Sequence, residues 1–208
     1  REDFAKIIEK HQKNRGPDFF KIKNFKNITI SHQRLSIVGL QKKFNQPFIF
    51  KNLVLSFNGE IYNFRSLAKE YSLTNDAFFS DTACLAELIF KIGINKAIEI
   101  IDGMFSICLF DRESQLITIC IDDFGIKQLY FTEIMNNLVI SSTVKPLIEI
   151  IKSCNGEISI DQNTKNWKPS FHGLPPGHTH ISQIKQINQK YVYEIKSGAN
   201  SFKLSNKS

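Results

Sequence analysis

The sequence predicts an α+β domain, in which antiparallel strand pairs are layered against helices. Two pairs of apolar runs, 104–111 with 115–121 and 130–133 with 138–142, are each joined by a short polar turn, as in β-hairpins. Stretches of helical period lie between and around these pairs, and few strand–helix–strand units are evident. This grouping favours the α+β class over a doubly wound parallel fold.

The N-terminal half begins with a helix and continues with short strands. A helix with one apolar face is predicted over residues 3–14, and the turn Arg15-Gly16-Pro17-Asp18 ends it. A short helix over 63–71 precedes a longer helix through Ile92, for which Ser80-Asp81-Thr82 offers the N-cap. Between the first two of these helices, strands are predicted at 28–31, 35–38, 48–50 and 53–57.

The C-terminal half contains the two hairpins and ends in polar sequence. A short helix over 95–101 precedes the hairpins, and a helix over 143–153 with Pro146 in its first turn follows them. Residues 154–170 read as a polar loop. Short strands are expected at 178–181 and 191–195, before a loose Ser/Asn/Lys tail.

Composition and charge exclude several classes of protein. The chain has 208 residues, enough for one large domain or two small ones, and its net charge of +7 comes from scattered lysines without a nucleic-acid motif. It has no run of 18 apolar residues, so no membrane partner is expected. The four cysteines form no C-x-x-C pair and three lie in apolar runs, which favours a cytoplasmic location.

Polar clusters interrupt the apolar pattern, and each has a structural interpretation on its own. R-G-P-D is a turn, and Arg34 in a strand is most often a solvated cation. Asn58-Gly59 is a hairpin signal, and Ser80-Asp81-Thr82 is a helix cap. The order in which these clusters occur along the chain carries more information than any one of them.

The ordered motifs resemble a known family over roughly residues 3–181. They are R-G-P-D, R-L-S-I-V, the Gln46-Pro47 pair, N-G-E-I-Y-N-F, S-D-T, D-G-M-F-S-I, D-D-F-G-I-K-Q-L-Y-F, S-S-T-V-K-P-L and L-P-P-G-H. Together they resemble the glutamine amidotransferase domain of glutamine-hydrolysing asparagine synthetase, a class II amidotransferase with the N-terminal-nucleophile hydrolase fold. The resemblance implies a four-layer αββα sandwich of two mainly antiparallel sheets. It assigns residues 1–182 to the glutaminase domain and 183–208 to a C-terminal strand and polar tail.

The resemblance also implies a pocket for L-glutamine. It gives the Asn58 amide and the Gly59 backbone N–H the role of oxyanion hole, where a tetrahedral intermediate needs donors. It makes Arg34 the partner of the substrate α-carboxylate, while Glu60 and Asp81 face the ammonium or the amide. The remaining substrate-binding groups are backbone atoms of Leu35, Ile37 and Val38.

The nucleophile of the family is an N-terminal cysteine on a Cys-Gly-Ile strand, with its own α-amino group as general base. The chain begins at Arg1, inside the expected first helix, so this strand is expected to be missing from it. Its own cysteines cannot substitute, since none is terminal. The chain also departs from the family at Asn14, Ile121, Gln128 and Thr143, where relatives usually carry His, Arg, Pro and Glu.

The resemblance implies partners outside the chain. The glutaminase domain needs no cofactor, whereas ATP and Mg²⁺ are expected in a C-terminal synthetase domain or subunit that receives ammonia through a closed channel. A homodimer is a further candidate. Two alternatives stay open: a glutamine-binding or interaction module without catalysis, and a class II amidotransferase that serves another acceptor. His172, His178 and His180 lie close in sequence, but no carboxylate or cysteine completes a ligand set, so no metal is expected.

Overall fold

The structure is a computed structural model that describes residues 2–165, 174–199 and 202–207. Its helices are α1 (Glu2–Gln12), α2 (Phe64–Glu70), α3 (Asp81–Ile92), α4 (Ile94–Ile100), α5 (Val144–Ser153) and α6 (Gln162–Lys165), with 3-10 turns η1 (Lys13–Arg15), η2 (Lys42–Phe44) and η3 (Asn75–Phe78). Its strands are β1 (Phe19–Phe25), β2 (Ile28–Arg34), β3 (Phe48–Phe50), β4 (Leu53–Ile61), β5 (Gly103–Asp111), β6 (Leu116–Ile121), β7 (Tyr130–Ile134), β8 (Asn137–Ser141), β9 (Lys185–Gln186), β10 (Tyr191–Lys196) and β11 (Lys203–Asn206).

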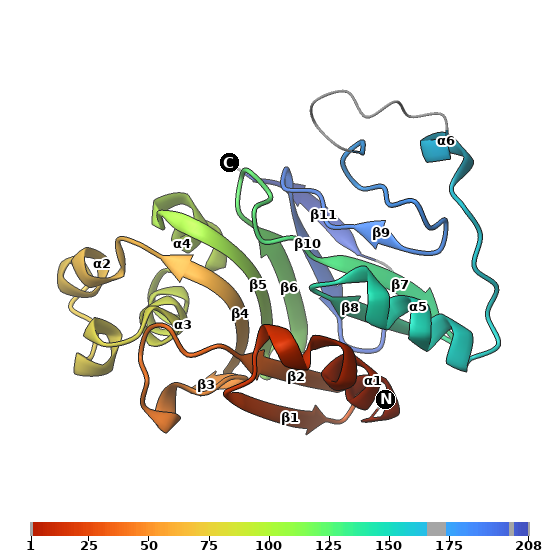
Figure 1. Cartoon of the computed structure of the whole chain (residues 1–208). Helices are drawn as coiled ribbons and strands as arrows, with labels where there is room; N and C mark the ends of the chain where they lie inside the picture. The colour runs from red at the N-terminus through yellow and green to blue at the C-terminus, as the bar shows by residue number, and fades with distance from the viewer. Residues whose placement is uncertain (1, 166–173, 200–201, 208) are drawn as a thin grey trace.

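A six-stranded antiparallel sheet forms the centre of the molecule (Figure 1). Its strand order is β11-β10-β6-β5-β4-β3, and the long pairing of β4 with β5 runs from Leu53 opposite Asp111 to Ile61 opposite Gly103. Residues beyond 182 contribute β10 and β11 to this sheet. The sheet therefore joins the middle and the C-terminal part of the chain in one layer.

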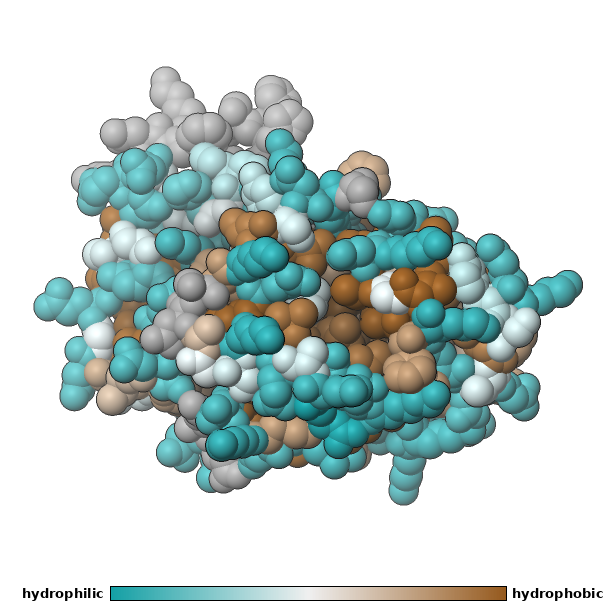
Figure 2. All heavy atoms as spheres, turned by 180° about the vertical axis from the view of Figure 1, so that it is seen from behind, coloured by the Kyte–Doolittle hydropathy of each residue, from teal (hydrophilic) through white to brown (hydrophobic). Residues whose placement is uncertain are grey.

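Helices α2, α3 and α4 cover one face of the sheet. Alternate residues of β4, including Leu55 and Phe57, point to this face and pack with apolar residues of α3 such as Leu85 and Leu88. Ser80 begins α3 by accepting a hydrogen bond from the Ala83 N–H at 3.3 Å, as its N-cap position predicts. Seen from behind, apolar side chains show between polar ones over the middle of the molecule (Figure 2).

The opposite face of the sheet looks toward a second strand layer, which consists of two separate sheets. One is the hairpin β1–β2, and the other has the order β8-β7-β9. Helices α1 and α5 pack against each other outside this layer, and Phe4, Ile7 and Ile8 of α1 join the apolar cluster around Ile150. The α+β class and the four layers of helix, sheet, sheet and helix are thus confirmed.

Two local predictions were wrong, and one strand was not predicted. Residues 35–38 form an irregular loop in place of a strand, because Arg34 binds the Val38 and Gly39 carbonyl oxygens at 2.9 and 2.5 Å and turns the chain back. Strand β1, with the sequence FFKIKNF, was not predicted, because its mixed apolar and polar residues form a strand only by pairing with β2. Of the strand expected at 178–181, only a bridge between Ile181 and Ile160 forms.

The tail is also more ordered than expected. Lys203–Asn206 form β11 and pair with β10, whose residues 191–194 lie opposite 203–206 in antiparallel register. Lys207 continues from this strand to the end of β6, where its ammonium contacts the Ile121 carbonyl oxygen. In the predicted polar loop at 154–170, α6 forms, and residues 166–170 lie outside the described part.

Candidate active site

Strand β4 carries polar side chains on the face that looks toward the second strand layer. Ser56 and Asn58 point to this face, opposite Cys108 and Ser106 of β5, and all four line one cavity. Glu60 follows at the same two-residue period. The apolar alternation of the strand therefore places the predicted oxyanion residue Asn58 and the predicted binding residue Glu60 on one face.

The backbone conformation and the close neighbours of residue 59 admit only glycine. A side-chain carbon at this position would lie 2.0 Å from the Met104 carbonyl oxygen, and the residue has φ +153°. Since both conditions exclude an ordinary side chain, only glycine allows β4 and β5 to pair here. The hairpin interpretation of Asn58-Gly59 is wrong, because both residues lie inside β4.

The backbone N–H of Gly59 points to the edge of β4 away from β5. Phe105, which lies opposite Gly59, directs its own N–H and C=O to Asp122, at 3.2 and 2.8 Å. In an antiparallel ladder, residue pairs that exchange backbone hydrogen bonds alternate with pairs that do not. Because the Phe105 backbone groups bond to Asp122, Gly59 and Phe105 are a pair of the second kind, and the Gly59 N–H is directed away from β5. Strand β3 pairs only with Leu53–Leu55 and does not reach this far along the edge.

Two side chains occupy the β4 edge on either side of Gly59. Gln46 donates from Nε2 to the Phe57 carbonyl oxygen at 2.9 Å and accepts from the Phe57 N–H at 2.6 Å. On the other side, Asp81 Oδ2 accepts from the Ile61 N–H at 3.4 Å. The Gly59 N–H therefore lies between these two side-chain caps on the β4 edge.

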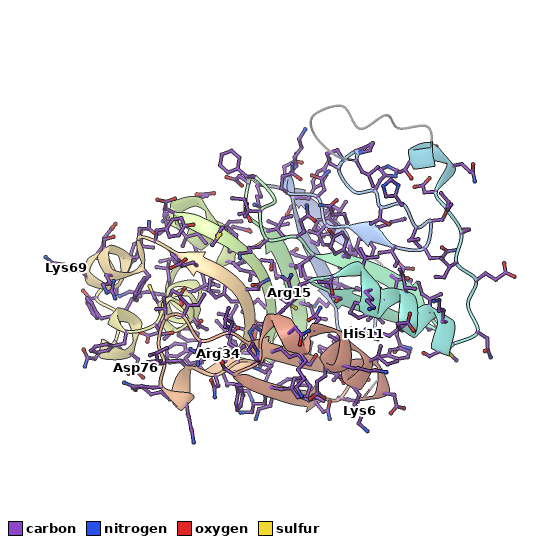
Figure 3. All side chains as sticks on the ribbon, viewed as in Figure 1. Lys6, His11, Arg15, Arg34, Lys69 and Asp76 are labelled. Carbon is purple, nitrogen blue, oxygen red and sulfur yellow. The ribbon has the colours of Figure 1, made fainter. Side chains whose placement is uncertain are left out.

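The guanidinium of Arg34 lies in a cradle of oxygen atoms. Nη1 donates to Asn45 Oδ1 at 2.6 Å, and Nη2 donates to the carbonyl oxygens of Val38 and Gly39. The residue is only 6% exposed, in contrast to surface cations such as Lys69 (Figure 3). These contacts use three of the five N–H groups of an arginine, so they leave two for another ligand.

The predicted charged residues Arg34, Glu60 and Asp81 influence one another electrostatically. Burial raises the pKa of Asp81, and hydrogen bonds from the backbone N–H groups of Thr82 and Ile61 partly offset this increase. The negative charge of Glu60 raises the pKa of Asp81 further, whereas the positive charge of Arg34 lowers it. Burial lowers the pKa of Arg34, while Asp81 and Asp18 oppose this shift. The charges of Arg34 and Glu60 are therefore close enough to Asp81 to influence its protonation.

The loop after Arg34 contributes backbone to the site and side chains to the surface. Leu35 and Ile37 are 55% and 69% exposed, so their side chains lie outside the site. The Val38 carbonyl faces Arg34, and Gly39 packs so closely on Ser80 that a side-chain carbon would lie 2.9 Å from Ser80 Cβ. The loop is thereby held against the N-terminus of α3, next to Asp81.

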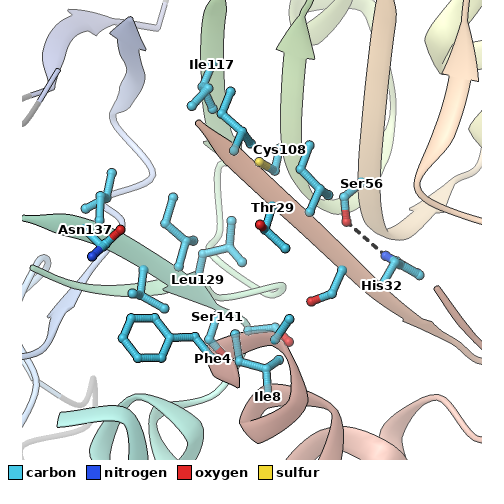
Figure 4. A pocket seen from close by; sticks show the side chains of 18 of the residues that line it. Phe4, Ile8, Thr29, His32, Ser56, Cys108, Ile117, Leu129, Asn137 and Ser141 are labelled. Atoms are coloured by element: carbon cyan, nitrogen blue, oxygen red, sulfur yellow. Dashed lines mark hydrogen bonds between the residues drawn. The ribbon is translucent and has the colours of Figure 1, made fainter. Parts of the chain in front are cut away.

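A cavity of about 590 Å³ extends from Asn58 between β2 and β8 (Figure 4). Side chains from β4 and β5 form its inner wall, and Phe4 and Ile8 of α1 close it from outside. Within the described residues, β2 is paired only with β1 and β8 only with β7, so each strand offers its other edge to the cavity. The two sheets of the second layer are separated by this cavity.

Hydrogen bonds at the margins of the cavity connect the second strand layer to neighbouring elements. His32 of β2 contacts Ser56 of β4 through Nδ1 and Oγ at 3.0 Å, and burial together with the Arg34 charge lowers the pKa of His32 to about 4. Gln12 of α1 donates to Ser141 Oγ at 2.8 Å and to Thr143 Oγ1 at 3.1 Å. Neutral His32 and Gln12 thus tie the second layer to its neighbours.

Asp122 fixes the loop that follows β6. Besides Phe105, it holds the N–H groups of Ile126 and Lys127 at 2.9 and 3.0 Å, and it is 2% exposed. In sequence, this aspartate and Gln46 were noted only as parts of motifs. Neither role could be found from spacing, because each depends on a backbone segment that is distant along the chain.

Three of the cysteines, Cys84, Cys108 and Cys120, are poor nucleophiles. Burial raises the pKa of Cys108, in the cavity, to about 11, and that of Cys84 and of Cys120 to about 12 each. At neutral pH these three thiols stay protonated, and the thiolate is the reactive form.

The histidines of the C-terminal part were considered as metal ligands. His178 Nδ1 lies 3.2 Å from Asp161 Oδ2, while His172 lies outside the described residues. In the part of the chain that the structure describes, no three His, Cys, Asp or Glu side chains group as a metal site. No helix in this part is long and apolar enough to span a membrane.

Comparisons with known proteins match one family over nearly the whole chain. The family described as glutamine amidotransferase domain matches residues 1–205. Glutamine-hydrolyzing asparagine synthetase 2 of Bacillus subtilis is 35% identical over 64% of this chain and 18% of its own length. Asparagine synthetase B of Escherichia coli is 33% identical over 70% of this chain and 27% of its own length. The nodule asparagine synthetase of Pisum sativum is 30% identical over 88% of this chain and 29% of its own length.

Solved structures show the same fold at low sequence identity. Glutamine phosphoribosylpyrophosphate amidotransferase from B. subtilis, complexed with ADP and GMP, superposes with a TM-score of 0.58 at 16% identity. The match covers 86% of this chain and 35% of that one. A structure described as the allosteric regulatory enzyme of purine biosynthesis gives a TM-score of 0.59, also at 16% identity.

The four-layer fold is shared with these two solved amidotransferase and purine-biosynthesis structures. By sequence, the chain belongs to the glutamine amidotransferase domain family, and the relatives it matches are named as asparagine synthetases. The chain spans only 18% and 34% of the length of two of these relatives, from B. subtilis and Methanocaldococcus jannaschii.

Proposed function

We propose that this chain hydrolyses L-glutamine to glutamate and ammonia, as the glutaminase part of an asparagine-synthetase-type enzyme. The observation that supports this most is the β4 edge, where the Gly59 N–H lies between the caps made by Gln46 and Asp81. Asn58 lies next to it and lines the cavity. Two donors at neighbouring positions suit the oxyanion of an amide under attack.

The charges around this edge suit free glutamine as the substrate. In the proposed complex, Arg34 binds the α-carboxylate with its two remaining N–H groups, while Asp81 and Glu60 bind the α-ammonium. An ammonium group beside Asp81 would also lower the pKa of this buried carboxyl and remove the cost of keeping it ionised. The site then selects a zwitterion with a side-chain amide over a simple amide.

The proposed nucleophile is an N-terminal cysteine on a segment that precedes Arg1. A strand in the cavity could pair with the second edges of both β2 and β8, because among the described residues β2 pairs only with β1 and β8 only with β7. Its end near Asn58 would hold the thiol close to the oxyanion donors. The α-amino group of the same cysteine has an ordinary pKa of about 7.7 to 8.0, which suits a general base near neutral pH.

The chemistry then follows two steps. The thiol passes its proton to the α-amino group and attacks the amide carbon, and Asn58 and Gly59 hold the resulting oxyanion. The ammonium returns the proton to the leaving nitrogen, which departs as ammonia and leaves a glutamyl thioester. Water, deprotonated by the same amine, cleaves the thioester to glutamate and restores the thiol.

The ammonia is proposed to reach a synthetase domain or subunit without contact with bulk water, since protonation would remove its nucleophilicity. The acceptor in this proposal is aspartate, activated by ATP and Mg²⁺ in the partner. The B. subtilis, E. coli and pea relatives are named as glutamine-hydrolyzing asparagine synthetases, and this chain corresponds to less than a third of each. A cytoplasmic location is part of the same proposal.

The substitution Asn58→Ala in the complete natural protein tests the proposal. Loss of one oxyanion donor is expected to lower kcat for glutamine hydrolysis by about 10² to 10³, with little change in KM. The measurement is glutamate release under saturating glutamine. N-terminal sequencing of the same preparation shows whether a cysteine precedes Arg1.

Two results would contradict the proposal. If the natural protein begins with a cysteine and releases no glutamate, the site binds glutamine without turning it over, as a binding module would. If Asn58→Ala changes KM alone, Asn58 contacts the substrate in the ground state and is no oxyanion donor.

A further inference from the structure

The loop after β6 carries apolar side chains that the described chain leaves uncovered. Phe124 is 88% exposed and Ile126 is 59% exposed, and Tyr62, directly after the end of β4, is 58% exposed. Single exposed apolar residues are common on protein surfaces. Here Phe124 and Ile126 share one short loop, and we call this loop, residues 122–127, the β6 end loop.

The β6 end loop is held rigidly although its side chains project outward. Asp122 binds the N–H groups of Ile126 and Lys127, and the Gly125 N–H donates to the Asp122 carbonyl oxygen at 3.0 Å. Lys207 adds a contact of 3.0 Å between its ammonium and Asp123 Oδ1. A rigid loop loses little conformational entropy when its exposed side chains become buried, which favours binding.

The β6 end loop is also connected to the candidate active site. Both backbone groups of Phe105 bond to Asp122, and Phe105 lies opposite Gly59. At the end of the same ladder, the Tyr62 N–H donates to the Asp102 carbonyl oxygen at 2.7 Å. A partner seated on this loop would lie one strand away from the strand that carries the oxyanion donors.

The C-terminal part of the described chain leads to the same place. Strand β11 ends at Asn206, and Lys207 reaches the β6 end loop through Asp123 and the Ile121 carbonyl oxygen (Figure 1). A segment that continues from here would emerge beside Phe124 and Ile126. Relatives such as the E. coli enzyme, of which this chain spans 27%, contain additional sequence that could provide such a segment.

We propose that the β6 end loop, with Phe124 and Ile126, is the surface on which the ammonia-accepting domain or subunit docks. This inference rests on the proposed function for the identity of the partner, whereas the burial of the loop can be measured without any activity. Docking here covers the apolar side chains and brings the acceptor next to the site of ammonia release.

Thiol labelling in the complete natural protein tests the burial. Phe124→Cys and Met135→Cys are prepared separately, because Met135 is 71% exposed and lies at the turn between β7 and β8, outside the proposed surface. With a maleimide as probe and peptide mass spectrometry as readout, position 124 is expected to react at least tenfold more slowly than position 135. Equal rates at the two positions would overturn the proposal.

A second measurement tests the coupling. In the complete protein with glutamine, aspartate and Mg-ATP, Phe124→Asp is expected to keep glutamate release within about twofold while free ammonia per glutamate rises severalfold. Met135→Asp, the control, should change neither. If the amount of free ammonia per glutamate is unchanged in Phe124→Asp, the docking surface is overturned. If the unsubstituted protein releases no glutamate while position 124 is still shielded from the maleimide, only the proposed function is overturned.

Discussion

Arg34 shows how one residue can shape both the fold and the candidate site. Its guanidinium gathers Asn45, Val38 and Gly39 around it, so the loop after β2 closes over the N-terminus of α3. The same positive charge lowers the pKa of Asp81 against the effect of burial. Arg34, which the family resemblance predicts to bind the substrate α-carboxylate, therefore also holds the loop of residues 35–39 in its conformation.

Replacing Arg34 should affect binding before catalysis. In the complete protein, Arg34→Ala removes a charge-assisted interaction worth roughly 2 to 4 kcal/mol, so KM for glutamine should rise about 30-fold or more. The control is Arg65→Ala, since Arg65 is exposed and stacks on Phe64 at 4.6 Å. An unchanged KM in an active Arg34→Ala protein would remove Arg34 from the substrate site.

The partly buried His32 should make stability depend on pH. Its pKa is about 4 in the folded protein and about 6.5 when unfolded, so the neutral form stabilises the fold fully above pH 6.5. This stability is lost as the pH falls from 6.5 through 4, up to about 3 kcal/mol in total. His32→Asn keeps a polar group beside Ser56 without a titrating ring.

The measurement for His32 is urea unfolding of both proteins at several pH values. The difference in unfolding free energy between the natural residue and His32→Asn should be constant above pH 6.5 and should decrease below it. A difference that stays constant down to pH 4 would show that His32 titrates normally.

At the scale of elements, helices and hairpins were predictable and loops between layers were not. The hairpins of β5 with β6 and β7 with β8, and the cap of α3 at Ser80, follow from local period and turn chemistry. Residues 35–38 have the composition of a strand, yet the Arg34 contacts override it. Such contacts join residues that only the tertiary fold brings together, so a local pattern could not show them.

The same division holds for the candidate site. Family resemblance named Arg34, Asn58, Gly59, Glu60 and Asp81, and the structure brings them to neighbouring positions on β2, β4 and α3. The roles of Gln46 and Asp122 needed coordinates, because each bonds to a backbone group that no spacing rule connects with it. The side chains of Leu35 and Ile37 point to solvent, which leaves only their backbone for the predicted role.

Gln46 should be important for strand β4. Gln46→Ala removes both bonds to the Phe57 backbone and leaves a donor and an acceptor unpaired in a buried position, which should cost about 2 to 4 kcal/mol. Gln41→Ala in the same loop is the control, since Gln41 is exposed. Urea unfolding measures both, and equal stability of the two variants would show that water replaces the Gln46 side chain.

At the scale of the whole molecule, the divided second layer is the main feature. Two small sheets, β1–β2 and β8-β7-β9, lie on either side of one cavity and are supported by α1 and α5. The central sheet is continuous and packs on its own helices, so it does not depend on the cavity. The two halves of the molecule should therefore differ in stability.

A strand in the cavity should protect β2 and β8 from hydrogen exchange. In the natural protein, we expect peptides that cover residues 137–141 to exchange at least tenfold more slowly than in a version that begins at Arg1. Peptides from β5 serve as the internal control, because its two edges are already paired with β4 and β6. Equal exchange of β8 in both proteins would show that no strand occupies the cavity.

The cavity between β2 and β8 has a consequence for the newly made protein. If one segment both unites the two small sheets and brings the reactive thiol to Asn58, then maturation of the enzyme and completion of its architecture are a single event. A nascent or damaged molecule in which this segment is out of place would then be unable to consume glutamine. The cell would be protected from wasteful ammonia release without a separate inhibitor.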